Sequence, residues 1–242
     1  GAVGHMVNGM AAGVVSLFDV VAPRCALDIV SAVLFGRGAP QAPTNMPVQT
    51  REAAEFADYI YDGDFNDDGA QAGGLLGALG IDYKPDGDLQ AALFRGKSGT
   101  FYLVARGTEF FNKQDWETNM EQDSGGRAAA YESFKKLVEQ TNERINELGG
   151  TLVLAGHSLG GALAIAGAHG SSLPAEVFNP AYVNKIYTRG QPAQIRVNVV
   201  CGDLLDLARW VRGMPAQGEM HYYRSKPCNG LNHSIGHFHD RR

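Results

Sequence analysis

Apolar and polar positions follow two different periods along this chain, and together they predict both strands and helices. The segments "AALFR" (91–95) and "TFYLVAR" (100–106) flank "GKSG", which has the length and the glycines of a hairpin loop. Short apolar or alternating runs predict further strands at "TLVLAG" (151–156), "QIRVNVVC" (194–201) and "EMHYYR" (219–224).

Helical periodicity appears between these strands. It predicts helices at 51–61, 127–148 and 159–170. The second of these helices has the clearest apolar stripe, in which Thr141 fills one gap: Tyr131, Phe134, Val138, Ile145 and Leu148. Gly149 and Gly150 then end it, as glycines do at a helix C-terminus. Strands that alternate with helices predict an α/β fold with a mostly parallel sheet flanked by helices.

Composition divides the chain into three parts. The opening "GAVGHM" (1–6) has the form of a cloning remnant, which we set apart from the fold. An apolar helical segment and a linker rich in proline follow (7–49). The remaining residues (50–242) are enough for one large α/β domain.

The apolar stretch at 7–35 is interrupted by charged residues and by Pro23, so no run in it is long enough to span a bilayer. It also lacks the basic leader of a signal peptide. We expect two short helices, broken at Pro23, that pack on the domain or on a partner subunit. The alternative is an interfacial segment that contacts a membrane surface.

Charge and cysteine content narrow the function classes. The net charge is −5 and no basic stripe is present, which argues against a nucleic-acid partner. The three cysteines are too few for a disulfide scaffold, and their spacing matches no zinc site. We expect free buried thiols, and a bridge between Cys201 and Cys228 is the alternative in an oxidising compartment.

The stretch "LAGHSLGG" (154–161) carries the main chemical signal, because its G-x-S-x-G follows a predicted strand and opens a predicted helix. In that context Ser158 is predicted to be a nucleophile. The glycines leave room for a sharp turn that lifts the Ser158 hydroxyl clear of the sheet, and the helix N-terminus points its free N–H groups at the same place.

A serine nucleophile needs a base and an acid that orients the base, and in α/β-hydrolases the order along the chain is Ser, Asp, His. Asp203 follows the strand at 194–201, where an acid that reaches the edge of the sheet is expected. Asp206 is the alternative, although it suits the first turn of a following helix better. For the base, the residues alone leave the choice between His233 and His237 open.

A metal motif also appears in the sequence. "DFNDDG" (64–69) matches the first half of a calcium loop through Asp64, Asn66 and Asp68. The twelfth position, where such a loop needs a glutamate, is Leu75. We therefore expect an acidic surface loop and no cofactor, with weak calcium binding as the alternative.

Taken together, "GHSLGGALA" and the upstream "VARGTEFFNKQDWETNM" resemble the class 3 lipases, a family of α/β-hydrolases with bacterial phospholipase-like members. The resemblance covers roughly residues 50 to 240. It implies oxyanion donors at Thr108, after Arg-Gly, and at the backbone N–H of Leu159. It also implies a lid at 109–120, whose apolar face would hold Phe110, Phe111 and Trp116. Ordinary core packing is the alternative role for these aromatic residues.

Two further segments bear on the resemblance. The tail "HSIGHF" is similar to the ending of bacterial members in which the first histidine is catalytic, and this implies His233 as the base. "VFNPAYVNK" (177–185) resembles the strand and loop that follow the nucleophile helix, but it lacks the arginine and the second glycine of the fungal enzymes.

These features predict a serine hydrolase that cleaves carboxylic esters of lipids through an acyl-enzyme, as a lipase or a phospholipase A does. Ser158, His233 and Asp203 would form its triad. The alternatives are a soluble short-chain carboxylesterase and a catalytically dead fold that binds lipid or another protein. We expect the protein to act outside the cell that produces it.

Overall fold

A six-stranded sheet with helices on both faces forms the core of the protein. The computed structural model describes residues 46–62, 74–83, 89–107, 124–190, 193–200, 203–223 and 233–238. The strands are β1 (Ala91–Arg95), β2 (Phe101–Ala105), β3 (Leu152–His157), β4 (Ala175–Phe178), β5 (Ile195–Val200) and β6 (Glu219–Tyr223). The helices are α3 (Val48–Asp62), α5 (Ser124–Glu147), α6 (Leu159–Ser171) and α7 (Leu204–Val211), with 3₁₀ turns η1 (Gly77–Leu79) and η2 (Ile235–His237).

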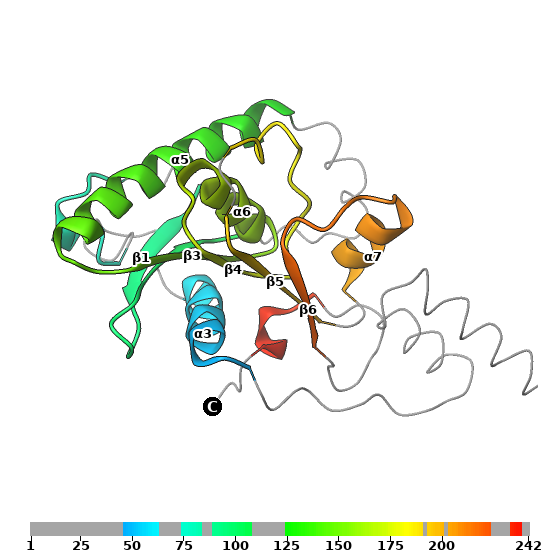
Figure 1. Cartoon of the computed structure of the whole chain (residues 1–242), viewed down its shortest axis with the longest axis horizontal. Helices are drawn as coiled ribbons and strands as arrows, with labels where there is room; N and C mark the ends of the chain where they lie inside the picture. Colours follow the sequence, from blue (N-terminus) through cyan, green and yellow to red (C-terminus); the bar gives the residue numbers. More distant parts are fainter. Residues whose placement is uncertain are drawn as a thin grey trace, which may run out of the picture.

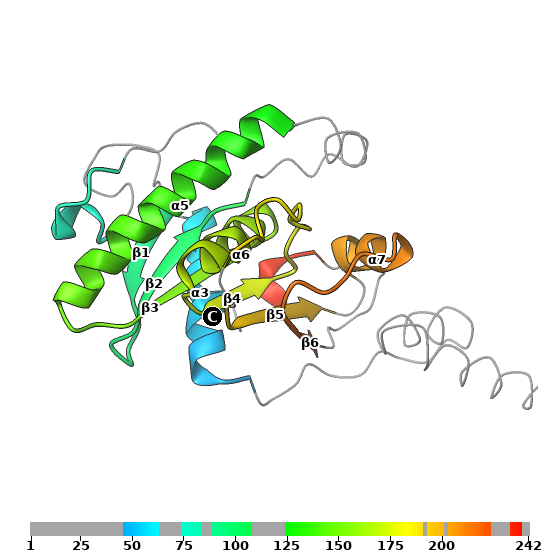
Figure 2. The ribbon, with the colours of Figure 1, turned by 45° about the horizontal axis from the view of Figure 1, so that its top comes forward.

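The strands lie side by side in the order in which they occur along the chain. β1 and β2 form the predicted antiparallel hairpin, and each later strand pairs parallel to the one before it. The carboxyl ends of β2 to β6 therefore meet at one edge of the sheet, which is where open α/β sheets bind ligands (Figure 2). The prediction of a mostly parallel sheet flanked by helices is confirmed.

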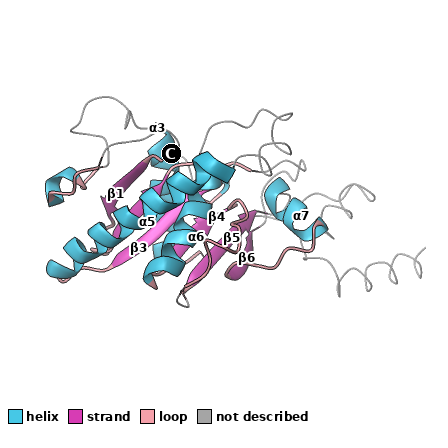
Figure 3. Ribbon diagram, turned by 90° about the horizontal axis from the view of Figure 1, so that it is seen from above, coloured by secondary structure: helices cyan, strands magenta, loops and turns pink. Residues whose placement is uncertain are grey.

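The two faces of the sheet are covered by different helices. α5 and α6 lie over one face, whereas α3 and η2 lie against the other (Figures 1 and 3). Because successive side chains of a strand point to opposite faces, each strand contributes to both cores. The core under α5 and α6 includes Leu93, Leu103, Leu154, Val177 and Val197. The core against α3 includes Ala92, Val104, Val153, Phe178 and Val200.

The three predicted helices begin and end within three residues of the predicted bounds, and two of the shifted boundaries have a clear structural reason. α3 begins at Val48, three residues before the predicted start at Arg51, because the carbonyl of Pro47 already accepts the Arg51 N–H at 3.0 Å. α5 ends at Glu147, and Leu148 is 61% exposed, so its predicted place in the apolar stripe is wrong. A turn carries the chain away there, and Gly149 has a left-handed φ of 67°.

Several predictions concern residues outside the described ranges. The predicted N-terminal helices at 7–35 lie there, and so do the three cysteines. The helices and the thiol state of the cysteines therefore stay predictions. Among the helices of the described residues, none combines the length and the hydropathy needed to cross a membrane.

Candidate active site

Ser158 lies in a strained turn between β3 and α6, at the edge where the parallel strands end. Its backbone has φ 58° and ψ −124°, a conformation that only glycine adopts readily. Such a residue persists only when its surroundings fix it. The Ser158 N–H donates to the carbonyl of Phe178 at 3.1 Å, and the Ser158 carbonyl accepts from Ala181 at 3.0 Å. The end of β4 and the loop that follows it therefore hold the Ser158 backbone in place.

The glycines around Ser158 are required by close contacts. A Cβ atom on Gly156 would lie 2.3 Å from the carbonyl oxygen of Gly160, and one on Gly160 would lie 2.1 Å from that of Ala105. Real Cβ atoms do not approach other atoms so closely. The strand-to-helix turn predicted from G-x-S-x-G is present, and its glycines allow α6 to start directly against the ends of β2 and β3.

The N-terminus of α6 supplies free N–H groups beside the serine. Leu159 is the first residue of this 13-residue helix. Its backbone N–H, like those of the next residues, has no acceptor within the helix. These donors and the helix dipole favour negative charge next to Ser158.

Asp203 and His233 form a short contact near this turn. The Nδ1 atom of His233 lies 2.5 Å from Oδ2 of Asp203, and only 2% of the Asp203 residue is exposed. The other oxygen, Oδ1, accepts the backbone N–H of Asp206 at 2.9 Å, so Asp203 caps the start of α7. With Nδ1–H donated to the carboxylate, Nε2 is the nitrogen of a neutral His233 that accepts a proton.

The structure brings His233 to the turn at Ser158 through His157, the residue before Ser158. The rings of His157 and His233 have centroids 4.8 Å apart. The Nε2 atom of His157 lies 2.6 Å from the backbone carbonyl oxygen of His233. The turn at Ser158, the predicted acid and the histidine predicted as base are therefore close together, although they come from different parts of the chain.

The two alternative residues have different surroundings. Asp206 lies in the first turn of α7, as expected, and its Oδ1 atom pairs with Nη2 of Arg209 at 2.6 Å. Burial raises the pKa of Asp206 despite this partner. For His237, at the end of η2, the structure describes the backbone only. In the described residues, Asp203 contacts His233 and Asp206 contacts Arg209.

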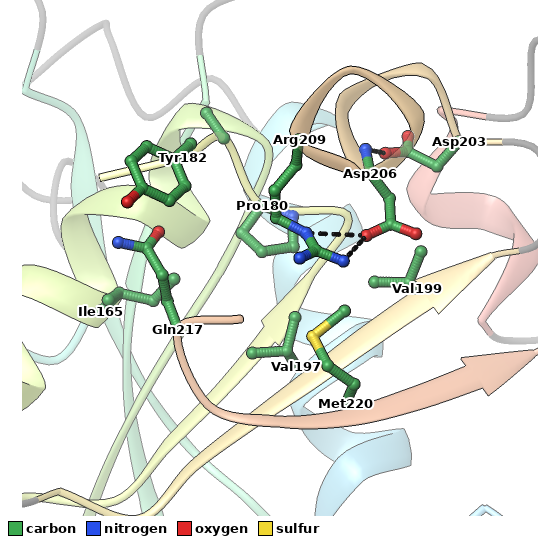
Figure 4. Close-up of a pocket in the computed structure, with 11 residues that line it drawn as sticks. Ile165, Pro180, Tyr182, Val197, Val199, Asp203, Asp206, Arg209, Gln217 and Met220 are labelled. Carbon is green, nitrogen blue, oxygen red and sulfur yellow. Dashed lines mark hydrogen bonds and ion pairs between the residues drawn. The ribbon is translucent and has the colours of Figure 1, made fainter. Parts of the chain in front are cut away.

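A small pocket adjoins Asp203 on the α6 side of the sheet (Figure 4). Its volume is about 20 Å³, room for roughly one water molecule. The close-up shows the ion pair of Asp206 and Arg209 facing the apolar side chains of Val199 and Met220. This pocket is too small to hold an acyl chain. A larger open hollow lies at the amino ends of β4 to β6, away from Ser158.

His157 and Tyr61 are part of this arrangement, and the sequence did not single them out. His157 is buried, and the loss of solvation lowers its pKa to about 3. Its Nδ1 atom lies 3.2 Å from the hydroxyl oxygen of Tyr61 on α3. The signal for His157 was its place inside "GHSLG", where the x of G-x-S-x-G carries no assigned role. Nothing in the pattern of α3 marked Tyr61.

Other predicted residues lie outside the described ranges. These are Thr108, the lid aromatics Phe110, Phe111 and Trp116, and the calcium candidates Asp64, Asn66 and Asp68. The described range 89–107 ends just before Thr108. A Cβ atom on Gly107 would lie 3.3 Å from Cβ of Ser158, so the segment just after β2 is adjacent to the turn at Ser158. Within the described ranges, no group of three or more His, Cys, Asp or Glu side chains is arranged to hold a metal ion.

Comparison with known proteins identifies a family and a fold. A family model described as "Phospholipase-like: Tle-like phospholipase domain" matches residues 52–201, more than half of the chain. No curated protein matches this sequence. Among solved structures, a lipase from Rhizopus microsporus var. chinensis is similar, with 15% identity, a TM-score of 0.51 and coverage of 84% of this chain and 90% of that one.

A second similar structure is a deletion mutant of Rhizomucor miehei lipase in complex with its propeptide. It has 19% identity and a TM-score of 0.51, and the match covers 79% of this chain and 76% of that one. At these identities the two structures show a shared fold. They support the α/β-hydrolase architecture, and together with the family model they confirm the resemblance to the class 3 lipases that the motifs implied.

Proposed function

The chain belongs to the family of Tle-like phospholipase domains and is a lipid ester hydrolase, and on this premise we propose that it cleaves phospholipid acyl esters through an acyl-enzyme on Ser158. The observation that carries this mechanism is the 2.5 Å contact of Asp203 with His233 beside a strained serine turn. Ser158, His233 and Asp203 would fill the three roles of a serine triad.

The proposed reaction begins at the Ser158 hydroxyl. Its oxygen attacks the ester carbonyl carbon while Nε2 of His233 takes the hydroxyl proton. Asp203 remains a carboxylate and stabilises the imidazolium that forms. The tetrahedral intermediate collapses when the C–O bond to the leaving alcohol breaks, and His233 returns its proton to that oxygen. Water then attacks the acyl-enzyme by the same sequence and releases the fatty acid.

Negative charge develops on the former carbonyl oxygen in both steps. We assign its stabilisation to the backbone N–H of Leu159 and to Thr108, which directly follows Gly107. The adjacency of Gly107 to Ser158 supports this assignment, because it brings the end of β2 to the start of α6. A single donor of this kind is worth about 3 kcal/mol in the transition state.

The family description is the reason to place phospholipid first among the ester substrates. The similar solved structures are lipases by name, which makes triacylglycerol the second candidate. Two further assignments rest on the sequence alone. The aromatic residues of 109–120 would cover the site as a lid, and the apolar stretch at 7–35 would contact the membrane surface.

Substrate profiling tests the choice of substrate. Purified protein is given phosphatidylcholine vesicles, a trioctanoylglycerol emulsion and soluble p-nitrophenyl butyrate, and fatty acid release is measured for each. We expect the highest specific activity on the vesicles. Higher activity on the emulsion would make the protein a triacylglycerol lipase, and activity on the soluble ester alone would make it a carboxylesterase.

Two serine variants frame this experiment. Ser158→Ala removes the nucleophile and should abolish release from every substrate. Ser172→Ala is the matched control, because Ser172 also has a positive φ, 60°, and lies exposed at the other end of α6. It should keep wild-type activity. Calcium is tested in the same assay with a chelator, and we expect no change in rate.

A further inference from the structure

His157 is held at both of its ring nitrogens by groups from distant parts of the chain. Nε2 lies 2.6 Å from the backbone carbonyl oxygen of His233, and Nδ1 lies 3.2 Å from the hydroxyl of Tyr61. The Tyr61 and His157 rings also meet edge to face, with centroids 5.9 Å apart. His157 therefore connects β3 with α3 and with the segment that carries the proposed base.

The chemistry of these partners fixes the direction of each hydrogen bond. A backbone carbonyl only accepts, so Nε2 of His157 must carry a proton and donate it to His233. Burial keeps the ring neutral by lowering its pKa to about 3, so Nδ1 bears a lone pair. The Tyr61 hydroxyl therefore donates to Nδ1. One neutral tautomer satisfies both contacts of the ring.

Tyr61 makes a third contact, with the end of β2. Its hydroxyl oxygen accepts the backbone N–H of Gly107 at 3.0 Å. Gly107 is fixed closely there, because a Cβ atom on it would lie 2.5 Å from the Tyr61 hydroxyl and 2.8 Å from the carbonyl oxygen of His157. The Arg106 guanidinium lies over the Tyr61 ring, 5.4 Å from its centroid, and packs against its face.

The contacts thus form one line across the site: the Gly107 N–H, the Tyr61 hydroxyl, the His157 ring and the His233 carbonyl. The first member directly precedes the proposed oxyanion residue Thr108. The last is the main chain of the proposed base. Ser158 directly follows His157. This line of hydrogen bonds joins three separate parts of the sequence. They are the end of β2 with the oxyanion residue that follows it (the oxyanion strand), the turn at Ser158, and the segment that carries His233.

We propose that His157 and Tyr61 are positioning residues of the active site, which hold the main chain of His233 in register with Ser158 and with the oxyanion strand. This inference rests on the proposed serine mechanism. Neither residue needs to touch the substrate. They act on the placement of the His233 imidazole, which Asp203 orients at Nδ1.

The expected effect is on turnover rather than on substrate binding. A displacement of about 1 Å between a nucleophile and its base can cost roughly 10²-fold in rate. Because neither residue is proposed to touch the substrate, KM on a soluble ester should change little. A purely structural role would instead lower thermal stability and the fraction of active protein, while the kcat of that fraction stayed the same.

Two polar substitutions at His157 separate these roles. His157→Gln carries its amide nitrogen at about the position of Nε2, so it can still donate to the His233 carbonyl. His157→Asn ends one bond earlier and cannot reach it. We expect His157→Gln to keep kcat for p-nitrophenyl butyrate within about threefold of wild type, whereas His157→Asn loses about 10- to 100-fold with KM within twofold. Active sites are counted by fluorophosphonate titration, so that kcat refers to folded protein.

Tyr61→Phe tests the line from its other end and serves if the His157 variants fold poorly. It removes the bond to Nδ1 and the acceptor for Gly107, and we expect kcat to fall about tenfold. Tyr59→Phe is the matched control, because it removes a hydroxyl two residues away on the same helix from a side chain that is 55% exposed. It should leave kcat unchanged.

The positioning role is overturned if His157→Asn and Tyr61→Phe keep wild-type kcat per titrated site, or if His157→Gln loses as much as His157→Asn. Ser158→Ala separates this result from a failure of the serine mechanism. If Ser158→Ala is inactive while His157→Asn retains full turnover, only the positioning role is wrong. If Ser158→Ala still hydrolyses the ester, both proposals fall.

Discussion

The Nδ1 atom of His233 lies 2.5 Å from Oδ2 of Asp203, while Oδ1 of the same carboxylate accepts the N–H of Asp206 at 2.9 Å. Both oxygens of Asp203 are therefore engaged, one by the imidazole and one by the start of α7. A carboxylate fixed in this way holds the imidazole in one tautomer, which leaves Nε2 to accept the Ser158 proton in the proposed mechanism.

Asp203→Asn tests the importance of this contact. The amide cannot stabilise an imidazolium, and its NH₂ group favours the wrong tautomer of His233. We expect kcat on a soluble ester to fall by a factor of about 10³ to 10⁴ with the fold retained. Asp206→Asn is the comparison, since it breaks the pair with Arg209 and should lower stability while most of the activity remains. Equal kcat losses in the two variants would contradict the assignment of Asp203.

The backbone of Ser158 predicts a conflict between activity and stability. At φ 58° and ψ −124°, a side chain costs about 1 to 3 kcal/mol that glycine does not. Ser158→Gly should therefore unfold at a higher urea concentration than Ser158→Ala, although both variants are inactive. Chemical denaturation followed by circular dichroism measures the difference. If Ser158→Gly were less stable than Ser158→Ala, the strain at this turn would not be real.

Gly160 and Gly170 lie in the same helix but have different surroundings. A Cβ atom on Gly160 would meet the Ala105 carbonyl oxygen at 2.1 Å, whereas one on Gly170 would lie 3.7 Å from the flexible side chain of Lys135. We expect Gly160→Ala to lower the free energy of unfolding by at least about 2 kcal/mol. Gly170→Ala should leave stability unchanged or raise it by up to about 1 kcal/mol. Urea titration of both variants measures the contrast, and similar midpoints would refute the close approach of α6 to β2.

Burial of His157 gives the protein a specific dependence of stability on pH. Its pKa is lowered to about 3, from an ordinary value of 6.5, so between these values the unfolded chain binds a proton that the native protein does not. Stability therefore falls as pH decreases through this window, with a limiting slope from this group of about 1.4 kcal/mol per pH unit. Tyr61 and His233 are the titratable groups in contact with the ring.

His157→Gln is the control for this pH effect, because glutamine does not titrate. The free energy of unfolding should fall less steeply between pH 6 and pH 4 in this variant than in the wild type. The two slopes should differ by up to about 1.4 kcal/mol per pH unit, the value for one proton. Denaturant titrations at a series of pH values measure the two slopes. Identical slopes would mean that His157 ionises in the folded protein.

The fold could be predicted largely from local patterns. The hairpin of β1 and β2, the buried strand β3 and the alanine-rich α6 each have a period that the side chains reveal. The G-x-S-x-G glycines predicted a tight turn, and the contact of Gly160 with Ala105 gives the physical reason. Leu148 was wrongly predicted to belong to the buried stripe of α5. Periodicity does not fix the last residue of a helix, and this helix ends one residue before Leu148.

The candidate site could be predicted only where chain position limits the choice. Asp203 comes soon after the end of a predicted strand, whereas Asp206 lies three residues later in the predicted helix. This position favoured Asp203 as the acid. The link between His157 and Tyr61 spans 96 residues and depends on how α3 packs against the sheet. No pattern within either segment encodes that contact, so the sequence left both residues without a role.

The most direct test of the serine mechanism is to find which residue an active-site probe modifies. Wild-type protein is treated with a fluorophosphonate and digested, and the modified peptide is identified by mass spectrometry, with phosphatidylcholine hydrolysis measured on the same sample. We expect one adduct on Ser158, loss of hydrolysis in proportion to labelling, and neither labelling nor hydrolysis in Ser158→Ala. Undiminished hydrolysis by Ser158→Ala, or an adduct on a different serine that tracks the loss of activity, would contradict this mechanism.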